Sequence, residues 1–183
     1  ADGTSGDGCG ILFKIPEFFF RSIANEEKIN IAKNFAIGMF FLNIDANKRK
    51  SSIKIIEKVI SESGFSLAGW RDVPTDKSIC GEDALKTLPY IAQAFINPPE
   101  KLDAKDTESR LFVIRRKIEI LVSKEKDETF YITSFSSKVI LYKGMIMPKH
   151  LSKFYLDLSN EKLETSLCVF HQRFSTNTTP QWS

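Results

Sequence analysis

The sequence predicts an α+β fold, formed by a single domain or a large piece of one. Strand-like and helix-like segments are mixed along the 183 residues without the regular spacing of βαβ units. Hydrophobic residues make up 42% of the chain and include 15 Phe, which is enough apolar material for a substantial core. No internal repeat and no low-complexity segment divides the chain.

The N-terminal half is expected to contain three strands and two helices. Pro16 suits the first position of a short helix. The run from Phe35 to Leu42 is hydrophobic throughout, too short to cross a membrane and typical of a buried strand. Apolar residues between positions 53 and 60 follow helical spacing, and Gly64 is a suitable C-terminal cap. We therefore expect a loop over 1–10, strands over 11–15, 34–43 and 65–73, and helices over 16–23 and 46–63.

The C-terminal half predicts a more mixed order of elements. Two prolines after Asn97 end one strand, and residues 166–173 alternate as expected for a final strand. The basic run Arg115 to Lys117 is typical of a solvated helix face. The remaining elements expected are a loop over 75–88, a strand over 90–96, an exposed polar segment over 100–109, a short strand over 111–114 that continues into a basic helix over 115–124, a hairpin of strands over 130–135 and 138–142, and a short helix over 148–156.

Charge and cysteine content exclude several classes of function. The net charge of +3 is too small to indicate nucleic acid or a membrane surface as a partner. Cys9, Cys80 and Cys168 are odd in number and scattered, which does not fit a disulfide framework and favours a reducing compartment such as the cytoplasm. No signal peptide is recognisable, and Ala1 is not an initiating Met, so we expect that it is not the native start.

The glycine-rich start of the chain, Gly3 to Gly10, has two interpretations. A phosphate-binding loop of a dinucleotide fold would follow a strand and open a helix, and a Walker loop would need Gly-Lys-Ser/Thr. This segment instead precedes a strand-like stretch and lacks that motif. We therefore favour a tight loop whose glycines adopt positive φ or allow close approach of the backbone.

Local spacing indicates neither a metal site nor a nucleophile. His150 and His171 are the only histidines, and no Cys or His pair has zinc spacing. Cys168 and His171 are three residues apart on a strand, so their side chains leave opposite faces, and Cys168 is expected to be a small core residue. Cys9 lies in the glycine-rich segment, where exposure is conceivable, but no base accompanies it.

Arg173 and the turn after it form the strongest candidate for a binding site. The rigid fork of donors on an arginine fits a carboxylate through two hydrogen bonds. Ser, Thr and Asn side chains over 175–179 are of the kind that bond to nearby backbone and hold tight loops. Together they would suit a small zwitterion such as an amino acid. A structural arginine that pairs with a buried carboxylate at a strand end is an equally supported alternative.

The same segment carries a family resemblance. Residues 171–178 (HQRFSTNT), with Pro180 and Trp182 behind them, resemble the HQR(F/Y)STNT-x-P-x-W signature of glutamate synthases. The opening ADGTSGDGCGI resembles the ADG-x-TGDGAGI segment of that family. Further motifs follow in the family's order over essentially the whole chain: residues 69–74 (GWRDVP), 111–119 (LFVIRRKIE), 130–134 (FYITS), 142–145 (YKGM) and 154–158 (FYLDL).

The resemblance implies the N-terminal class II glutamine amidotransferase domain of these enzymes, with the four-layer αββα sandwich of N-terminal-nucleophile hydrolases. There, a cysteine at the mature N-terminus, with its own α-amino group as base, attacks the glutamine side-chain amide, and water then releases glutamate from the thioester. An Asn-Gly pair supplies the oxyanion hole. Ammonia passes through a tunnel to a synthase domain that aminates 2-oxoglutarate with FMN, an iron–sulfur cluster and NAD(P)H or ferredoxin, in some cases with a small electron-donating subunit.

Three residues of this chain are assigned by the resemblance to binding L-glutamine. Arg173 matches the arginine that grips the α-carboxylate, Thr176 matches a threonine that lines the same pocket, and Asn177 occupies the adjacent position. Residues 166–173 are expected to be a central strand that delivers Arg173. Cys9 stands where the family usually has Ala, and Thr179 stands where an aromatic residue is common.

No catalytic residue, metal ligand or cofactor site is expected within the chain itself. The resemblance places the cysteine nucleophile upstream of Ala1 and the oxyanion pair beyond Ser183. Residues 1–183 are thus expected to be an internal part of one amidotransferase domain, truncated at both ends and inactive in isolation. The expected compartment is the cytoplasm, or a plastid if the source is a plant or alga.

Two alternatives stay open at this stage. One is another class II amidotransferase, of the glucosamine-phosphate or asparagine synthetase type, although these lack the HQRFSTNT string. The other is a non-catalytic module that keeps the fold and has lost the nucleophile.

Overall fold

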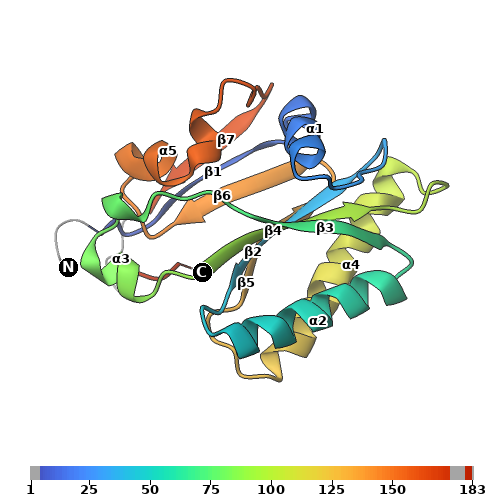
Figure 1. Cartoon of the computed structure of the whole chain (residues 1–183), viewed down its shortest axis with the longest axis horizontal. Coiled ribbons are helices and arrows are strands. Elements are labelled where there is room, and N and C mark those ends of the chain that lie inside the picture. The colour runs from blue at the N-terminus through green and yellow to red at the C-terminus, as the bar shows by residue number, and fades with distance from the viewer. Residues whose placement is uncertain (1–4, 174–179, 183) are drawn as a thin grey trace.

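Two stacked antiparallel sheets with two long helices on one outer face make up the chain, as the computed structural model shows for residues 5–173 and 180–182 (Figure 1). In chain order the elements are β1 (Cys9–Lys14), α1 (Glu17–Glu26), β2 (Ala36–Leu42), α2 (Ala46–Glu62), β3 (Ser66–Asp72), η1 (Lys77–Ile79), α3 (Glu82–Lys86), β4 (Tyr90–Asn97), α4 (Ala104–Ser123), β5 (Tyr131–Ser136), β6 (Val139–Gly144), η2 (Pro148–His150), α5 (Leu151–Phe154), η3 (Leu156–Ser159) and β7 (Cys168–Gln172).

The two sheets have the strand orders β6-β1-β7 and β3-β4-β2-β5. Each pairing within them is antiparallel. With α2 and α4 on the outside of the four-stranded sheet, the described residues account for three layers of an αββα sandwich (Figure 1). The predicted α+β class is confirmed.

Strand β2 separates the two hydrophobic cores of the molecule. All of its residues are buried, and successive side chains point to opposite faces of a strand. Met39 and Phe41 lie in the core between the sheets, whereas Phe40 and Leu42 lie in the core under α2 and α4. A strand with both faces covered has no polar face, which explains the continuous hydrophobic run in the sequence.

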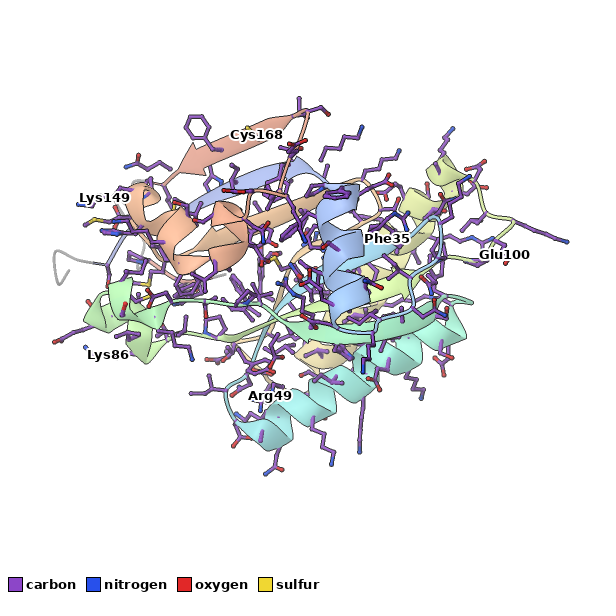
Figure 2. The ribbon with its side chains drawn as sticks, turned by 45° about the horizontal axis from the view of Figure 1, so that its top comes forward. Phe35, Arg49, Lys86, Glu100, Lys149 and Cys168 are labelled. Carbon is purple, nitrogen blue, oxygen red and sulfur yellow. The ribbon has the colours of Figure 1, made fainter. Side chains whose placement is uncertain are left out.

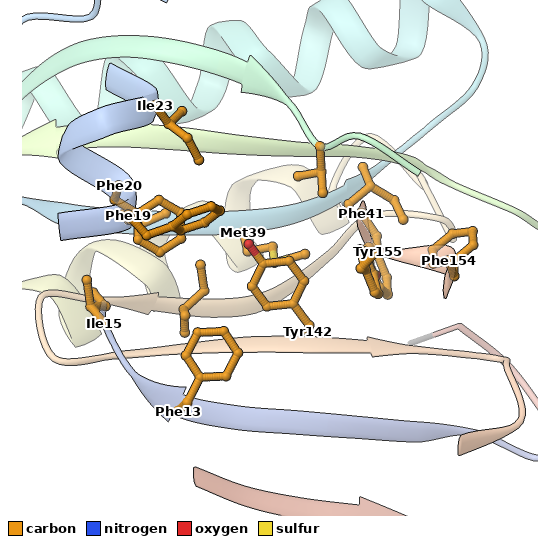
Figure 3. Close-up of a cluster of buried hydrophobic side chains, with 14 of the residues drawn as sticks. Phe13, Ile15, Phe19, Phe20, Ile23, Met39, Phe41, Tyr142, Phe154 and Tyr155 are labelled. Carbon is orange, nitrogen blue, oxygen red and sulfur yellow. The ribbon is translucent and has the colours of Figure 1, made fainter. Parts of the chain in front are cut away.

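Aromatic side chains fill the space between the two sheets (Figure 3). Phe19 and Phe20 enter it from α1. Phe13 of β1 stacks on Tyr142 of β6, with ring centroids 5.5 Å apart. The ring of Tyr142 also meets Tyr155 edge to face at 5.0 Å. Seven of the 15 Phe side chains lie in this core, more than in the core under α2 and α4.

Helix α4 corrects one prediction. Residues 111–114 are not a strand but the middle of a helix that also includes most of the polar segment expected over 100–109. Leu111, Ile114, Ile118 and Val122 are buried against the sheet at helical spacing. The four residues LFVI, taken alone, favour a strand, and the helical period becomes visible only over a longer window.

None of the helices among the described residues is both long and apolar enough to cross a membrane.

The predicted hairpin over 130–135 and 138–142 is wrong in its pairing. Both strands exist, but β5 pairs with β2 and β6 pairs with β1, so the chain crosses from one sheet to the other between them. Side chains replace the missing ladder: the Thr133 hydroxyl donates to the Leu141 carbonyl oxygen at 3.0 Å, and the Leu141 amide donates to Ser134 Oγ at 3.1 Å. The two sheets are therefore tied together at this edge.

Strand β7 is the least covered strand among the described residues. It pairs with β1 alone and all five of its residues are exposed, with Phe170 at 79%. The expectation of a central strand over 166–173 is thus not met in the described part of the chain. Cys168, labelled on this strand in Figure 2, is exposed and not the small core residue predicted, because no described strand lies on the far side of β7.

Candidate functional site

Arg173 follows β7 directly and is tied to the glycine-rich start of the chain. Its backbone amide donates to the Gly8 carbonyl oxygen at 2.8 Å. Gly8 has φ +126°, a conformation that side chains rarely tolerate. Glycine at this position therefore lets the chain turn into β1 while it presents its carbonyl oxygen to the end of β7.

Close backbone packing explains a second glycine of the same segment. A Cβ built on Gly6 would lie 2.3 Å from the carbonyl carbon of Ile146. The loop at residues 5–8 is thus pressed against the segment after β6. The interpretation of a tight loop with positive φ and close approach is confirmed at Gly8 and Gly6 respectively.

An open groove of about 520 Å³ lies beside Arg173. Its volume falls within the range of roughly 300–1,000 Å³ seen for small-ligand sites. The glycine loop forms one wall, residues 147–149 form another, and the end of β7 forms the third; the lining consists of Ser5, Gly6, Asp7, Gly8, Met147, Pro148, Lys149, Gln172 and Arg173. Lys149 marks this end of the molecule in Figure 2. The groove is large enough for an amino acid, and the Arg173 side chain, which is exposed, borders it.

A second cation lies close to Arg173. Burial lowers the pKa of Lys143, and the neighbouring charge of Arg173 lowers it further. The Lys143 ammonium lies 4.7 Å from the centroid of the Tyr131 ring, which provides a cation–π contact. Two neighbouring cations create a local positive potential, which an anionic group such as a carboxylate would relieve.

The other two predicted binding residues, Thr176 and Asn177, lie outside the described residues, as does Thr179. The chain is described again from Pro180 to Trp182. Trp182 is buried in the inter-sheet core, and its indole nitrogen donates to the Ala84 carbonyl oxygen of α3 at 3.0 Å. Of the described residues on either side of the predicted turn, Arg173 thus borders the groove and Trp182 lies in the core.

The cysteines do not offer a nucleophile in the described part of the chain. Cys9 is 2% exposed on β1 and not in an open loop, and burial raises the pKa of its thiol to about 11. A thiol in that state stays protonated and unreactive near neutral pH. Burial also raises the pKa of Cys80, and Cys168 lies exposed on β7.

Among residues 5–173 and 180–182 no group of three His, Cys, Asp or Glu side chains is placed to hold a metal ion.

Sequence reasoning missed a buried polar network between the sheets. Arg71 on β3 is 6% exposed and makes a bidentate pair with Asp157, at 2.8 and 2.7 Å. The same guanidinium donates to Gln93 on β4 at 2.9 Å and to Glu27 at 3.1 Å. The Tyr142 hydroxyl donates to Asp157 at 2.7 Å and accepts from Gln93 at 3.0 Å.

This network gives two of the sequence motifs a structural role. Arg71 lies in the GWRDVP segment and Asp157 in the FYLDL segment. Burial by itself lowers the pKa of Arg71, but the hydrogen bonds and charge of Asp157 outweigh that effect and raise it overall. A charged residue within a predicted strand was the available signal, because a buried arginine requires a carboxylate partner.

Comparison with known proteins adds independent findings. The model of the family "Glutamine amidotransferases class-II" matches residues 1–183. Ferredoxin-dependent glutamate synthase 2, chloroplastic, of Arabidopsis thaliana is 38% identical over 187 residues, which cover 100% of this chain and 11% of that protein. The glutamate synthase (NADPH) large chain of Azospirillum brasilense is 38% identical over 184 residues, with 100% and 12% covered. The ferredoxin-dependent glutamate synthase of Cyanidium caldarium is 40% identical over 190 residues, again with 100% and 12% covered. The chain therefore spans 11–12% of the length of these curated relatives.

Proposed function

This chain belongs to the class II glutamine amidotransferases, and we propose that it is an internal part of the glutaminase domain of a glutamate synthase. The domain would hydrolyse L-glutamine to glutamate and ammonia. The observation that carries the proposal is the position of Arg173, which borders an open groove at the end of β7 in a chain that the family model matches throughout. Its α+β fold, with two stacked sheets, agrees with the N-terminal-nucleophile hydrolase fold of this family.

Arg173 would bind the α-carboxylate of glutamine. A guanidinium donates two parallel hydrogen bonds to a carboxylate, and the charge-assisted bonds are stronger than neutral ones. Lys143 adds positive potential on the same side of the sheet. Thr176 and Asn177, in the segment directly after Arg173, would complete the pocket. These residues would orient the substrate and leave the reacting amide to groups elsewhere in the domain.

The nucleophile and the oxyanion donors would come from residues of the longer protein outside this chain. The chemistry of the family uses an N-terminal cysteine, which attacks the amide carbon while its own α-amino group takes the proton. Cys9 is unsuited to this task because it is buried and its pKa is raised to about 11. Burial raises the pKa of Cys80 as well, which disfavours its thiolate.

Ammonia released at this site would be used by a synthase domain of the same polypeptide. Relatives of the chain are named as ferredoxin-dependent or NADPH-dependent glutamate synthases, which implies a reductant. FMN and an iron–sulfur cluster would belong to that synthase domain, as the resemblance to glutamate synthases implies. Ammonia would aminate 2-oxoglutarate there, and in some enzymes a small subunit would deliver the electrons.

The compartment is proposed to be the cytoplasm, or a plastid in a plant or alga. Two Arabidopsis thaliana relatives are named as chloroplastic and as chloroplastic/mitochondrial. A reducing compartment agrees with the three free cysteines.

The proposed function is tested with the full-length protein. Purified enzyme should release ammonia and glutamate from L-glutamine, and a glutamine analogue with a diazoketone in place of the amide should block this release. Mass spectrometry should find the analogue on an N-terminal cysteine and not on Cys9, Cys80 or Cys168. Absence of ammonia release would contradict the proposal, and labelling of one of these three cysteines would contradict the placement of the nucleophile. Residues 1–183 alone should release no ammonia above background.

A further inference from the structure

The outer layer formed by α2 and α4 is strongly basic. Helix α2 contains five Lys or Arg residues against two Glu, and α4 contains five against three Asp or Glu. The two helices together therefore exceed the net charge of +3 of the whole chain, and the remainder of the chain is slightly acidic. Positive charge thus gathers on one face of the molecule, on the side away from β7 (Figure 1).

Two mainly apolar hollows lie along the seam where α2 and α4 meet. The first has a volume of about 310 Å³ and is lined by Ser63, Ser109, Arg110, Val113, Ile114 and Lys117. The second has a volume of about 220 Å³ and is lined by Val59, Glu62, Ser63, Lys117, Ile120 and Leu121. Because Ser63 and Lys117 belong to both, the two hollows adjoin and Lys117 stands between them.

Exposed side chains on this face of α4 repeat every seven residues. Val113 and Ile120 are seven positions apart, and so are Arg110, Lys117 and Lys124. Seven residues are about two turns of an α-helix, or roughly 10 Å along its axis, so each set lies on one side of the helix. This is the period with which a second helix packs against a first.

The three cations of this face have no acidic partner in the part of the chain that the structure describes. Arg110, Lys117 and Lys124 take part in none of its ion pairs. Glu62, which lines the second hollow, is paired with Lys58 at 3.8 Å. A partner that carries carboxylates at the same spacing would therefore meet complementary charge along the seam.

We propose that the seam between α2 and α4 is a docking site for an acidic amphipathic helix from a part of the same polypeptide outside residues 1–183. This inference rests on the proposed function, which places the chain inside a longer enzyme, and the chain spans only 11–12% of its curated relatives. Two apolar side chains of that helix, seven residues apart, would enter the hollows. A carboxylate between them would meet Lys117.

A second copy of this chain is a less suitable occupant of the seam. Two such faces packed together would place the cations of one copy against those of the other, and like charges across an interface cost free energy. A helix within the same polypeptide also has a high effective concentration at the seam, so a modest contact area is sufficient for docking.

Thiol labelling of the full-length enzyme tests whether the hollows are covered. Cysteine is introduced at one of two neighbouring exposed positions of α4, as Val113→Cys or as Phe112→Cys. Phe112 is the matched control, because it lines neither hollow. Mass spectrometry of the labelled peptide should show that the thiol of Val113→Cys reacts with a maleimide about tenfold more slowly than that of Phe112→Cys, since the centre of an interface excludes water. Equal rates would overturn the proposal.

Charge reversal tests the contribution of Lys117 to docking. Lys117→Glu should release the acidic helix and raise the labelling rate of Val113→Cys several-fold, because it places a carboxylate against a carboxylate. Lys105→Glu, which changes an exposed lysine of the same helix that lines neither hollow, should leave that rate unchanged. The same response to both reversals would contradict a specific contact at Lys117.

Cross-linking with a carbodiimide identifies the occupant, because this reagent joins an amine to a carboxylate in contact with it. Lys117 should become linked to an Asp or Glu of the same polypeptide outside residues 1–183. In an equal mixture of isotope-labelled and unlabelled enzyme, such a link gives only products of uniform isotope composition. Products of mixed composition, or a link to another subunit, would overturn the proposal. Failure of the wild-type enzyme to release ammonia would instead overturn the proposed function, whatever the cross-links show.

Discussion

Two arginines of this chain, Arg71 and Arg173, lie at opposite extremes of burial. Arg71 is 6% exposed, lies between the sheets and is saturated by Asp157, Gln93 and Glu27. Arg173 lies at the end of an exposed strand beside an open groove. The motif containing each was recognisable in the sequence, but only the structure separates a buried arginine that holds the fold from an exposed one beside a groove.

The difference follows from burial. A guanidinium has five N–H groups, and burial obliges the protein to provide partners for them. Arg71 therefore requires contributions from β4, from η3 and from the residue after α1. Arg173 is exposed beside the groove, so a carboxylate could approach its side chain from solvent at a smaller desolvation cost than in the core. The following changes test this contrast.

The largest effect is expected for Arg71→Ala. It would leave the Asp157 carboxylate buried without its cation, which should lower the free energy of unfolding by about 3–5 kcal/mol. Urea denaturation would measure this loss. The matched control is Arg116→Ala, which removes an exposed arginine paired with Glu119 and should cost less than about 1 kcal/mol. Equal losses in the two variants would remove the distinction between core and surface arginines.

Arg173→Ala should affect binding and not stability. Loss of a bidentate carboxylate contact of about 2–3 kcal/mol corresponds to an increase of roughly 30- to 150-fold in the KM for glutamine. Steady-state kinetics of the full-length enzyme would measure this, with thermal unfolding of the same variant as the control. An unchanged KM combined with a lower melting temperature would assign Arg173 to structure.

Gly8→Ala tests whether the backbone hydrogen bond from Arg173 to Gly8 holds Arg173 in position. A side chain at φ +126° is strained by about 2 kcal/mol, and relief of that strain would turn the Gly8 carbonyl away from the Arg173 amide. We expect lower stability and a raised glutamine KM together, measured by denaturation and by kinetics. Gly64→Ala is the control for strain alone, because Gly64 also has positive φ, at +79°, and lies far along the chain at the end of α2. A raised glutamine KM in Gly64→Ala would argue against a local effect.

The smallest effect is expected for Tyr142→Phe. The substitution removes only the hydroxyl, which donates to Asp157 and accepts from Gln93. Arg71 still neutralises the carboxylate and still bonds Gln93, so the cost should be about 1.5 kcal/mol. Chemical denaturation checks it. A cost as large as that of Arg71→Ala would mean that the network acts as a single unit whose members cannot be ranked.

Local patterns predicted those parts of the fold in which one segment determines its own structure. The buried β2, the long α2 and the strands β3 and β4 were expected close to their observed bounds, because hydrophobic period and caps act within each segment. The strand expected over 111–114 failed because packing of Leu111 and Ile114 on the sheet extends α4 through it. Pairing of β5 with β2 and of β6 with β1 depends on residues far away in the sequence, and a short connection suggested a hairpin instead.

The geometry around the candidate site could be anticipated only in part. Arg173 could be selected because its side-chain chemistry and its family motif agree, and glycine at position 8 because a tight loop demands it. Neither the bond between Arg173 and Gly8 nor the pair of hydrogen bonds that links Trp182 through Ala84 to Ser5 could be anticipated, since each joins the two ends of the chain. Burial of Cys9 likewise depends on β1 lying between β6 and β7.

The unequal cover of β2 and β7 has a kinetic consequence. Amide protons of β2, flanked by strands on both sides and buried on both faces, should exchange with solvent only when the whole domain unfolds. Those of β7, which pairs only with β1 among the described strands, should exchange in residues 1–183 through small openings that leave both cores intact. In this chain, the strand that precedes Arg173 should thus open on a faster timescale than the strand that organises the sheets.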